Sequence, residues 1–164
     1  MNSNTKQTIV LATDHAGFEL KEAIKKFLES EKFQVLDVGA HELVPEDDYP
    51  IYMSAAAMKV AQDLSGNTRA IIFGGSGQGE AIVANRFPGV RAVVWYGGGV
   101  HSNTGADLDI VKLSREHNDS NVLSIGARFV SETDAKKAVE LWLSTPFSGE
   151  EKHARRITQI DSIE

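Results

Sequence analysis

Short apolar runs alternate along the chain with longer segments in which apolar side chains recur every three to four positions. Short runs that are apolar throughout are typical of strands buried on both faces, whereas the recurrence is typical of amphipathic helices. We therefore expect strands at 8–12, 33–38, 70–73, 90–95 and 122–125. Helices are expected at 18–31, 50–64, 80–86, 108–118 and 131–144, and a last helix follows 148–151 and reaches the C-terminus.

The alternation of strand and helix, about five times over, indicates the class of fold. Short apolar strands joined by helices imply a parallel sheet covered by helices on both faces, which is a three-layer α/β fold. The chain of 164 residues has no internal repeat and no change of composition that would mark a domain boundary. We therefore expect one domain over residues 1–164, with residues 1–7 as a frayed tail.

Composition excludes several classes of function. The formal net charge of -6 and the pI near 5.4 argue against general binding to nucleic acid or to a membrane surface. No cysteine is present, which excludes disulfides, thiolate catalysis and cysteine zinc sites. No apolar run approaches the roughly 20 residues of a membrane span, and the polar N-terminus lacks the apolar stretch of a signal peptide. We expect a cytoplasmic protein.

The glycine-rich turn after the third expected strand is the most informative candidate site. It reads Gly74-Gly75-Ser76-Gly77-Gln78-Gly79-Glu80. Glycines let the backbone bend tightly and present amide groups to an anion. A phosphate-binding P-loop would have Lys and then Ser or Thr after its last glycine, and a dinucleotide-binding turn would have a third glycine where this chain has Glu80. The turn therefore fits neither nucleotide motif.

Glu80 changes the interpretation of this turn. A carboxylate beside an anion-binding turn is suited to a catalytic base that faces an oxyanion, and a position in the first helical turn favours the ionised form at neutral pH. The alternative is a tight strand-to-helix connection followed by an ordinary acidic residue at the start of a helix. The pattern alone leaves both interpretations open.

Other candidate residues lie in three places. Asp14 and His15 end the first strand, where parallel sheets bind ligands, although such a pair also satisfies local backbone groups. His117 closes a helix, either as a cap or as a general acid and base. Lys152 and Arg156 are four residues apart and share a helix face, so their repulsion favours an anion between them unless both are simply solvated.

No metal-binding motif is present in the sequence. The histidines are residues 15, 41, 101, 117 and 153, and none forms a close helical or strand pair with another, so we expect no metal. Ser76 lies within a glycine-rich segment, but its flanks do not form the elbow of a serine hydrolase. Arg128, after the fifth expected strand, is a third candidate cation.

Taken together, these segments resemble the ribose-5-phosphate isomerase B family and its galactose-6-phosphate isomerase relatives. The matching segments occur in the family's order over nearly the whole chain, so the resemblance is specific. They are 14–21, 48–50, 74–80, 84–86, 115–119, 126–128 and 153–156.

The resemblance implies a Rossmann-like αβα sandwich that forms a homodimer, or a dimer of dimers, with the active site between subunits. It implies interconversion of ribose 5-phosphate and ribulose 5-phosphate, in pentose phosphate metabolism, without a metal or cofactor. His117 would assist opening of the furanose ring, and the amides of 75–79 would form an anion hole. The substrate-binding residues it implies are Asp14, His15, Tyr49, Gly75, Ser76, Gly77, Gln78, Gly79, Asn118, Arg128, Lys152 and Arg156.

The chain departs from the family's usual pattern in three respects. Many members have a cysteine base where this chain has Gly74, but one subgroup has the same glycine-rich turn and uses its glutamate instead. By this resemblance Glu80 removes the C2 proton through a cis-enediolate. Lys152 stands where arginine is usual, which keeps the charge but loses bidentate geometry. Residues 97–109 resemble an insertion beside the substrate mouth.

Three alternative functions stay open at this point. The insertion at 97–109 leaves room for another sugar phosphate, such as a hexose 6-phosphate or a tetrose phosphate. A non-catalytic sugar-phosphate sensor is disfavoured by Glu80 together with His117, because binding alone needs neither an acid nor a base. A nucleotide-binding module is disfavoured by the missing P-loop lysine and the broken dinucleotide pattern.

Overall fold

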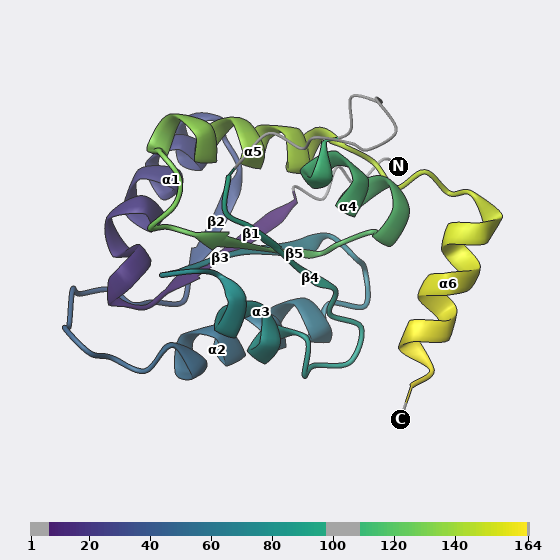
Figure 1. Cartoon of the computed structure of the whole chain (residues 1–164), viewed down its shortest axis with the longest axis horizontal. Helices are drawn as coiled ribbons and strands as arrows, with labels where there is room; N and C mark the ends of the chain where they lie inside the picture. Colours follow the sequence, from purple (N-terminus) through teal and green to yellow (C-terminus); the bar gives the residue numbers. More distant parts are fainter. Residues whose placement is uncertain (1–6, 98–108, 164) are drawn as a thin grey trace.

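Five parallel strands form a single sheet in the order β2-β1-β3-β5-β4. The structure is a computed structural model, and it describes residues 7–97 and 109–163 (Figure 1). The strands are β1 Thr8–Thr13, β2 Gln34–Asp37, β3 Thr68–Gly74, β4 Ala92–Trp95 and β5 Val122–Gly126. From β1 the chain passes to β2 on one side of the sheet, whereas the strands that follow β3, namely β4 and β5, lie on the other side. The strand order therefore reverses between β1 and β3. Open parallel sheets bind ligands at such a point, beyond the carboxyl ends of the strands.

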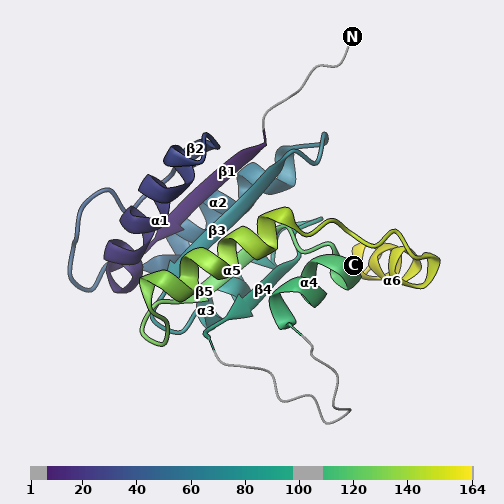
Figure 2. The same cartoon turned by 90° about the horizontal axis from the view of Figure 1, so that it is seen from above.

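Helices cover both faces of the sheet. One face carries α1, α4 and α5, and the other carries α2 and α3, while α6 stands beside the three layers (Figures 1 and 2). The α/β sandwich, its five-stranded parallel sheet and the C-terminal helix are therefore confirmed. The helices are the short 3-10 helix η1 His15–Gly17, then α1 Phe18–Ser30, α2 Tyr49–Gln62, α3 Gln78–Ala84, α4 Ile110–Asn118, α5 Glu132–Ser144 and α6 Glu151–Asp161.

Successive side chains of the central strand β3 point to opposite faces of the sheet and so belong to two separate halves of the core. Ile71 and Phe73 pack toward the face of α1 and α5, while Ala70 and Ile72 pack toward the face of α2. All four side chains are fully buried, which is why the strand is apolar at successive positions rather than at every second one. The centre of the sheet is therefore apolar on both faces, and we look for ligand-binding groups beyond the ends of the strands.

Element boundaries differ from the sequence-based expectation at two points that matter for the site. Helix α3 begins at Gln78, two residues earlier than expected, so Glu80 is its third residue rather than its first. Strand β4 begins at Ala92 rather than at residue 90. The expected frayed tail and most of the expected insertion at 97–109 lie outside the described residues. No helix in the described part of the chain is long and apolar enough to cross a membrane.

A buried lysine joins α1 to the end of β2. Lys21 is fully buried, and its ammonium group donates to Asp37 Oδ2 at 2.7 Å and to the carbonyl of Ala40 at 2.8 Å. Lys25 donates to the same carboxylate oxygen at 3.0 Å. Burial by itself would raise the pKa of Asp37, but hydrogen bonds from Lys21, Lys25 and the amide of Gly39 lower it below its ordinary value.

Replacing Asp37 with asparagine should strongly destabilise the protein. The change leaves the buried ammonium of Lys21 with Glu22, whose Oε1 lies 2.8 Å away and whose side chain is 35% exposed, as its remaining carboxylate partner among the described residues. Breaking a buried ion pair costs about 3–5 kcal/mol of unfolding free energy, and because Glu22 offsets part of the loss we expect a value at the lower end of this range. Lys25→Met is the matched control, because its side chain is 30% exposed and contacts the same oxygen, and the expected loss is below ~1 kcal/mol. Urea unfolding measures both.

The same ion pair predicts a loss of stability in acid. Because the pKa of Asp37 is lowered in the folded state, its stabilising contribution is present above its ordinary pKa of 3.8 and is lost as the pH falls through the lower folded-state value.

Equal losses of stability in Asp37→Asn and Lys25→Met would contradict this account of Lys21.

Candidate active site

A pocket of about 390 Å³ opens at the carboxyl ends of β1 and β3, where the strand order reverses. It brings together eight of the residues singled out from the sequence, drawn from four separate segments of the chain. Its lining residues are Asp14, His15, Ala16, Tyr49, Gly75, Ser76, Gly79, Glu80, Arg128 and Phe129. Of these, only Ala16 and Phe129 were not candidates.

The glycine-rich turn is held against the end of β5. Gly77 adopts a left-handed conformation with φ of 78°, which glycine reaches without strain, and its carbonyl accepts a hydrogen bond from the buried Ser124 Oγ at 2.7 Å. A methyl group added at Gly126 would lie 2.7 Å from the carbonyl oxygen of Ser76, so the turn and strand approach as closely as glycine allows. Gln78 opens α3, and its amide donates to Ser76 Oγ at 3.3 Å.

The carboxyl group of Glu80 occupies the space where a side chain on Gly74 would lie. A Cβ atom built on Gly74 would be 1.8 Å from Glu80 Oε1, so the two cannot coexist. Glu80 is only 5% exposed, although it lines the pocket. Its Oε2 atom has no hydrogen-bond partner among the described residues. The glycine at 74 therefore positions a buried carboxyl group at the mouth of the pocket.

Burial raises the pKa of Glu80 above its ordinary value. The backbone amides of Glu80 itself and of Gly77 act in the opposite direction, and the negative charge of Asp14 raises the pKa further. The position in the first helical turn, which by itself favours the anion, is thus not the largest influence on this pKa. The reason is that loss of hydration outweighs the helix amides once the side chain turns inward. A carboxylate with a raised pKa is better suited to accept and return a proton.

Two further glycines in the turn allow polar side chains to approach the backbone closely. The guanidinium of Arg128 lies over Gly75, where an added Cβ would be 3.2 Å from its Cζ atom. The hydroxyl of Tyr49 lies over Gly79, where an added Cβ would be 2.6 Å away. Arg128 also donates its backbone amide to the carbonyl of Gly75 at 3.2 Å. The turn thus presents a cation and a hydroxyl beside its amides.

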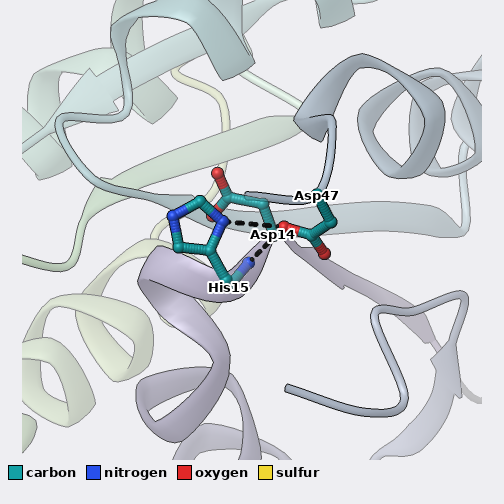
Figure 3. A group of neighbouring side chains, drawn as sticks. All are labelled: Asp14, His15 and Asp47. Carbon is teal, nitrogen blue, oxygen red and sulfur yellow. Dashed lines mark hydrogen bonds and ion pairs between the residues drawn. The ribbon is translucent and has the colours of Figure 1, made fainter. Parts of the chain in front are cut away.

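Asp14, His15 and Asp47 form a polar cluster (Figure 3), and Asp14 and His15 of this cluster line the pocket. Asp47 Oδ1 accepts from the backbone amide of His15 and lies 2.8 Å from its Nδ1 atom, so one carboxylate holds both the backbone and the ring. Asp14 Oδ1 accepts from the amide of Ala16 at 3.0 Å, which is the local backbone role that the sequence left open. Asp14 nevertheless also lines the pocket.

Asp47 is the functional contact that sequence reasoning missed. Burial alone would raise its pKa, but hydrogen bonds from His15 and from Tyr52 lower it below the ordinary value, so its charge is retained. A bond from Nδ1–H to Asp47 sets the tautomer of His15 and leaves Nε2 free for a ligand. The only signal in the sequence was an acidic residue just before a helix start, which is common on protein surfaces.

The same cluster contains the one group of residues in the described chain that could hold a metal ion. One ligand atom from each of Asp14, His15 and Asp47 lies within 4.8 Å of the others. A metal bound to His15 Nδ1 would have to replace its 2.8 Å contact with Asp47. The donor set is therefore already used as a hydrogen-bonded carboxylate–histidine pair, and we assign it no metal.

Four candidate residues lie away from this pocket. His117 and Asn118 are exposed at the C-terminal end of α4. This end of the helix lies near the amino ends of the strands, whereas the pocket lies at their carboxyl ends. Lys152 and Arg156 are exposed on α6. The His117 ring lies 4.2 Å from the ring of the buried His153. Within one chain, the structure does not bring these residues to Glu80.

Lys152 already has a carboxylate partner on its own chain. The ammonium of Lys152 lies 2.8 Å from Glu150 Oε2, so a carboxylate already matches its charge. Both partners are more than half exposed, so this contact is easily exchanged for another anion.

Comparison with known proteins agrees with this architecture. The profile of the Ribose/Galactose Isomerase family matches residues 9–160, and the chain belongs to that family. The chain is 37% identical over 157 residues to ribose-5-phosphate isomerase B of Mycolicibacterium paratuberculosis, with 95% of this chain and 91% of the relative covered. It is 36% identical to the Escherichia coli ribose-5-phosphate isomerase B, with 95% of each chain covered.

Solved structures show the same similarity. Ribose-5-phosphate isomerase B from Mycoplasma genitalium, with bound ribulose-5-phosphate, has a TM-score of 0.83 and 32% identity, covering 94% of this chain and 93% of that one. The Thermotoga maritima ribose 5-phosphate isomerase has a TM-score of 0.79 and 36% identity, covering 96% and 99%. The chain is therefore an enzyme of the isomerase class.

Replacing Glu80 with glutamine should stabilise the protein increasingly as the pH rises. Because burial raises the folded-state pKa above the ordinary 4.5, ionising Glu80 is less favourable in the folded than in the unfolded chain. That penalty is absent in acid and grows as the pH rises through the folded-state pKa, and glutamine removes it. Urea unfolding of both proteins at about pH 4 and about pH 7 measures the change.

Glu19→Gln is the matched control, because Glu19 is an exposed glutamate in the first turn of α1. If Glu80→Gln gained no stability relative to wild type between the two pH values, Glu80 would not carry a burial penalty.

Proposed function

We propose that this chain interconverts D-ribose 5-phosphate and D-ribulose 5-phosphate, with Glu80 as the base. The observation that carries the proposal is the carboxyl group of Glu80, buried in the space left open by Gly74 and facing a pocket that also holds Arg128. The bound ribulose-5-phosphate of the Mycoplasma genitalium relative supports the choice of substrate.

Proton transfer within this pocket accounts for the reaction. The Glu80 carboxylate removes the proton from C2 of the open-chain aldose, and the electrons of that C–H bond form a cis-enediolate as negative charge develops on the C1 oxygen. Glu80 then returns its proton to C1, while the hydroxyl proton of the C2 oxygen passes to the C1 oxygen. Amides of the 75–79 turn and the Ser76 hydroxyl stabilise the charge on oxygen, and such preorganised donors are worth roughly 3–4 kcal/mol each.

The remaining candidate residues complete the site if a second copy of the chain supplies them. His117, Asn118, Lys152 and Arg156 lie at the opposite edge or on α6, yet the resemblance assigns all four to the substrate. Helix α6 stands beside the layers of its own chain (Figure 1), and Phe129, 64% exposed, leaves an apolar side chain uncovered at the pocket rim. We propose a homodimer, alone or paired into a tetramer, with each site built from two copies.

In that arrangement each group has a separate task. His117 from the second copy moves a proton during opening of the furanose ring. Lys152 and Arg156 from the second copy join Arg128 in holding the phosphate. Asp14, His15, Tyr49 and Asn118 bind the sugar hydroxyls. Keeping the phosphate away from Glu80 also avoids raising the pKa of the base further.

A non-catalytic sugar-phosphate sensor fits the pocket less well. A buried carboxyl group beside an anion site weakens anion binding, and Glu80 has no structural hydrogen bond to its Oε2 atom that would explain its place. We also propose a single domain, a reaction that needs no metal, and a cytoplasmic location in pentose phosphate metabolism. The continuous sheet supports the single domain, and the His15–Asp47 hydrogen bond supports a reaction without a metal. The absence of cysteine supports the cytoplasmic location.

Glu80→Gln should reduce turnover of ribose 5-phosphate by about 10²–10⁴-fold, since a positioned base contributes that much to proton transfer. Incorporation of solvent deuterium at C2 should be lost, while substrate binding stays measurable. Gly74→Ala should have a similar effect, because its methyl group would lie 1.8 Å from Glu80 Oε1 and displace the carboxyl group. NMR of the sugar in deuterium oxide, with chelator present, measures exchange.

The control for charge is Glu19→Gln, which should keep wild-type turnover. An active Glu80→Gln enzyme would refute the assignment of the base. A panel of pentose, tetrose and hexose phosphates, run on the wild type, distinguishes the proposed substrate from the other sugar phosphates.

Mixing two inactive variants tests whether each site is shared between copies. If Glu80 and His117 meet across a dimer, a Glu80→Gln chain paired with a His117→Ala chain contains one intact site. Random pairing of equal amounts then restores about a quarter of wild-type activity, although each variant alone is inactive. Co-expression with two different affinity tags isolates the hybrid. A hybrid as inactive as its parents would place both residues in one chain or exclude one of them.

A further inference from the structure

A second pocket, of about 300 Å³, lies beside the amino ends of β3 and β5, whereas Glu80 lies beyond the carboxyl ends of the strands. Three arginines line it, Arg69 from β3, Arg91 just before β4 and Arg115 from α4. The lining carboxylates are Asp63 and Asp119, and Asp161 of α6 lies 3.6 Å from Arg91 Nη1, so three carboxylates stand beside the three arginines. How these groups pair therefore decides which charge is left unmatched.

The two carboxylates of this pocket are already in use. Asp119 lies 2.8 Å from Arg115 Nη1 and 3.1 Å from Arg91 Nη2, one oxygen to each. Asp63 accepts from the backbone amide of Thr68 at 2.6 Å and from Ser65, and these bonds lower its pKa to about 2. Neither carboxylate is within ion-pair distance of Arg69 in the described part of the chain.

Arg69 is therefore the unmatched charge. Its one hydrogen bond among the described residues runs from Nη1 to the carbonyl of Leu143 at 3.3 Å, which leaves most of its N–H groups without a protein acceptor. Its guanidinium stacks on the indole of Trp142 at 5.5 Å, and that of Arg115 lies 5.9 Å from the same ring. Burial, and then the nearby Arg115, lower the pKa of Arg69 to about 10.

A half-buried guanidinium next to a second one is unfavourable without a counterion. Stacking on Trp142 offsets part of this, as cation–π contacts do, but it leaves the N–H groups of Arg69 unsatisfied. A planar guanidinium donates two parallel hydrogen bonds to the oxygens of a phosphate, which would satisfy the N–H groups of Arg69 that have no acceptor among the described residues.

We propose that this pocket is a binding site for a phosphate group, held by Arg69 in the field of Arg91 and Arg115. The site is separate from the pocket of Glu80 and lies across the sheet from it. The phosphate can come from inorganic phosphate or from a small phosphate monoester, since both present the same dianion. The proposal does not depend on the reaction assigned to Glu80.

Trp142 supplies a direct reporter for this site. The chain has two tryptophans, so Trp95→Phe leaves Trp142, on which Arg69 stacks, as the sole source of indole fluorescence. In that variant, titration with inorganic phosphate at constant ionic strength should give a saturable change of emission. Glycerol 3-phosphate, run in parallel, distinguishes a monoester from the free ion. Sodium acetate at equal ionic strength should give no saturable change.

Arg69→Met, made in the same background, should weaken the phosphate response at least tenfold while ribose 5-phosphate turnover stays at the level of the parent. Arg69→Gln repeats the test with a polar side chain, in case methionine impairs folding. Lys137→Met is the matched control, because it removes one positive charge from an exposed position and should keep the response.

Lys152→Ala combined with Arg156→Ala should also keep the response, which separates this site from the proposed catalytic one. A response that survives loss of Arg69, that acetate reproduces, or that never saturates in the parent would overturn the proposal. A loss of the response in the Lys152 and Arg156 double variant would also overturn it, because the phosphate would then be bound at the catalytic site.

Discussion

The contact between Glu80 and the empty side-chain position of Gly74 decides how the rest of the catalytic pocket is arranged. The carboxyl group can turn inward only because residue 74 has no side chain, and once inward it loses water and its pKa rises. The glycine-rich turn that carries Glu80 is held in place by the Ser124 hydroxyl, which donates a hydrogen bond to the carbonyl of Gly77. Burial disfavours the ionised form of this carboxyl group, which is the property that the proposed role of Glu80 as a base requires.

Two buried contacts hold the segment between β2 and α2 that reaches the pocket. Lys21 is enclosed with Asp37 and the carbonyl of Ala40, so the segment that leaves β2 is fixed at its start. Further along this segment, Asp47 bonds to both the amide and the ring of His15. One ion pair and one carboxylate–histidine pair thus hold the loop that completes the pocket wall, which explains how a long loop can orient a side chain for a ligand.

The two edges of the sheet have opposite electrostatic character. At the carboxyl ends of the strands, Glu80 and Asp14 approach each other, and the pocket holds a single cation, Arg128. At the amino ends, Arg69 and Arg115 lie over the ring of Trp142, and Arg69 has no carboxylate within ion-pair distance among the described residues. Charged groups at either end of the strands need a partner from the chain itself or from a ligand. A second copy of the chain at the carboxyl ends and a bound anion at the amino ends would each supply one.

The sequence by itself determined the strand-and-helix order and the parallel sheet, because periodicity is a local property of the chain. It also predicted a site beyond the carboxyl ends of the strands and offered Glu80 and Asp14 as candidates for it, while leaving their purely structural interpretations open. Only the tertiary structure decided that Glu80 fills the space at Gly74, that Asp47 bonds to His15, and that His117 lies near the amino ends of the strands. It also decided that Arg69 has no carboxylate partner among the described residues. Each of these is a distance between residues far apart in sequence or a degree of burial, and no local pattern encodes either.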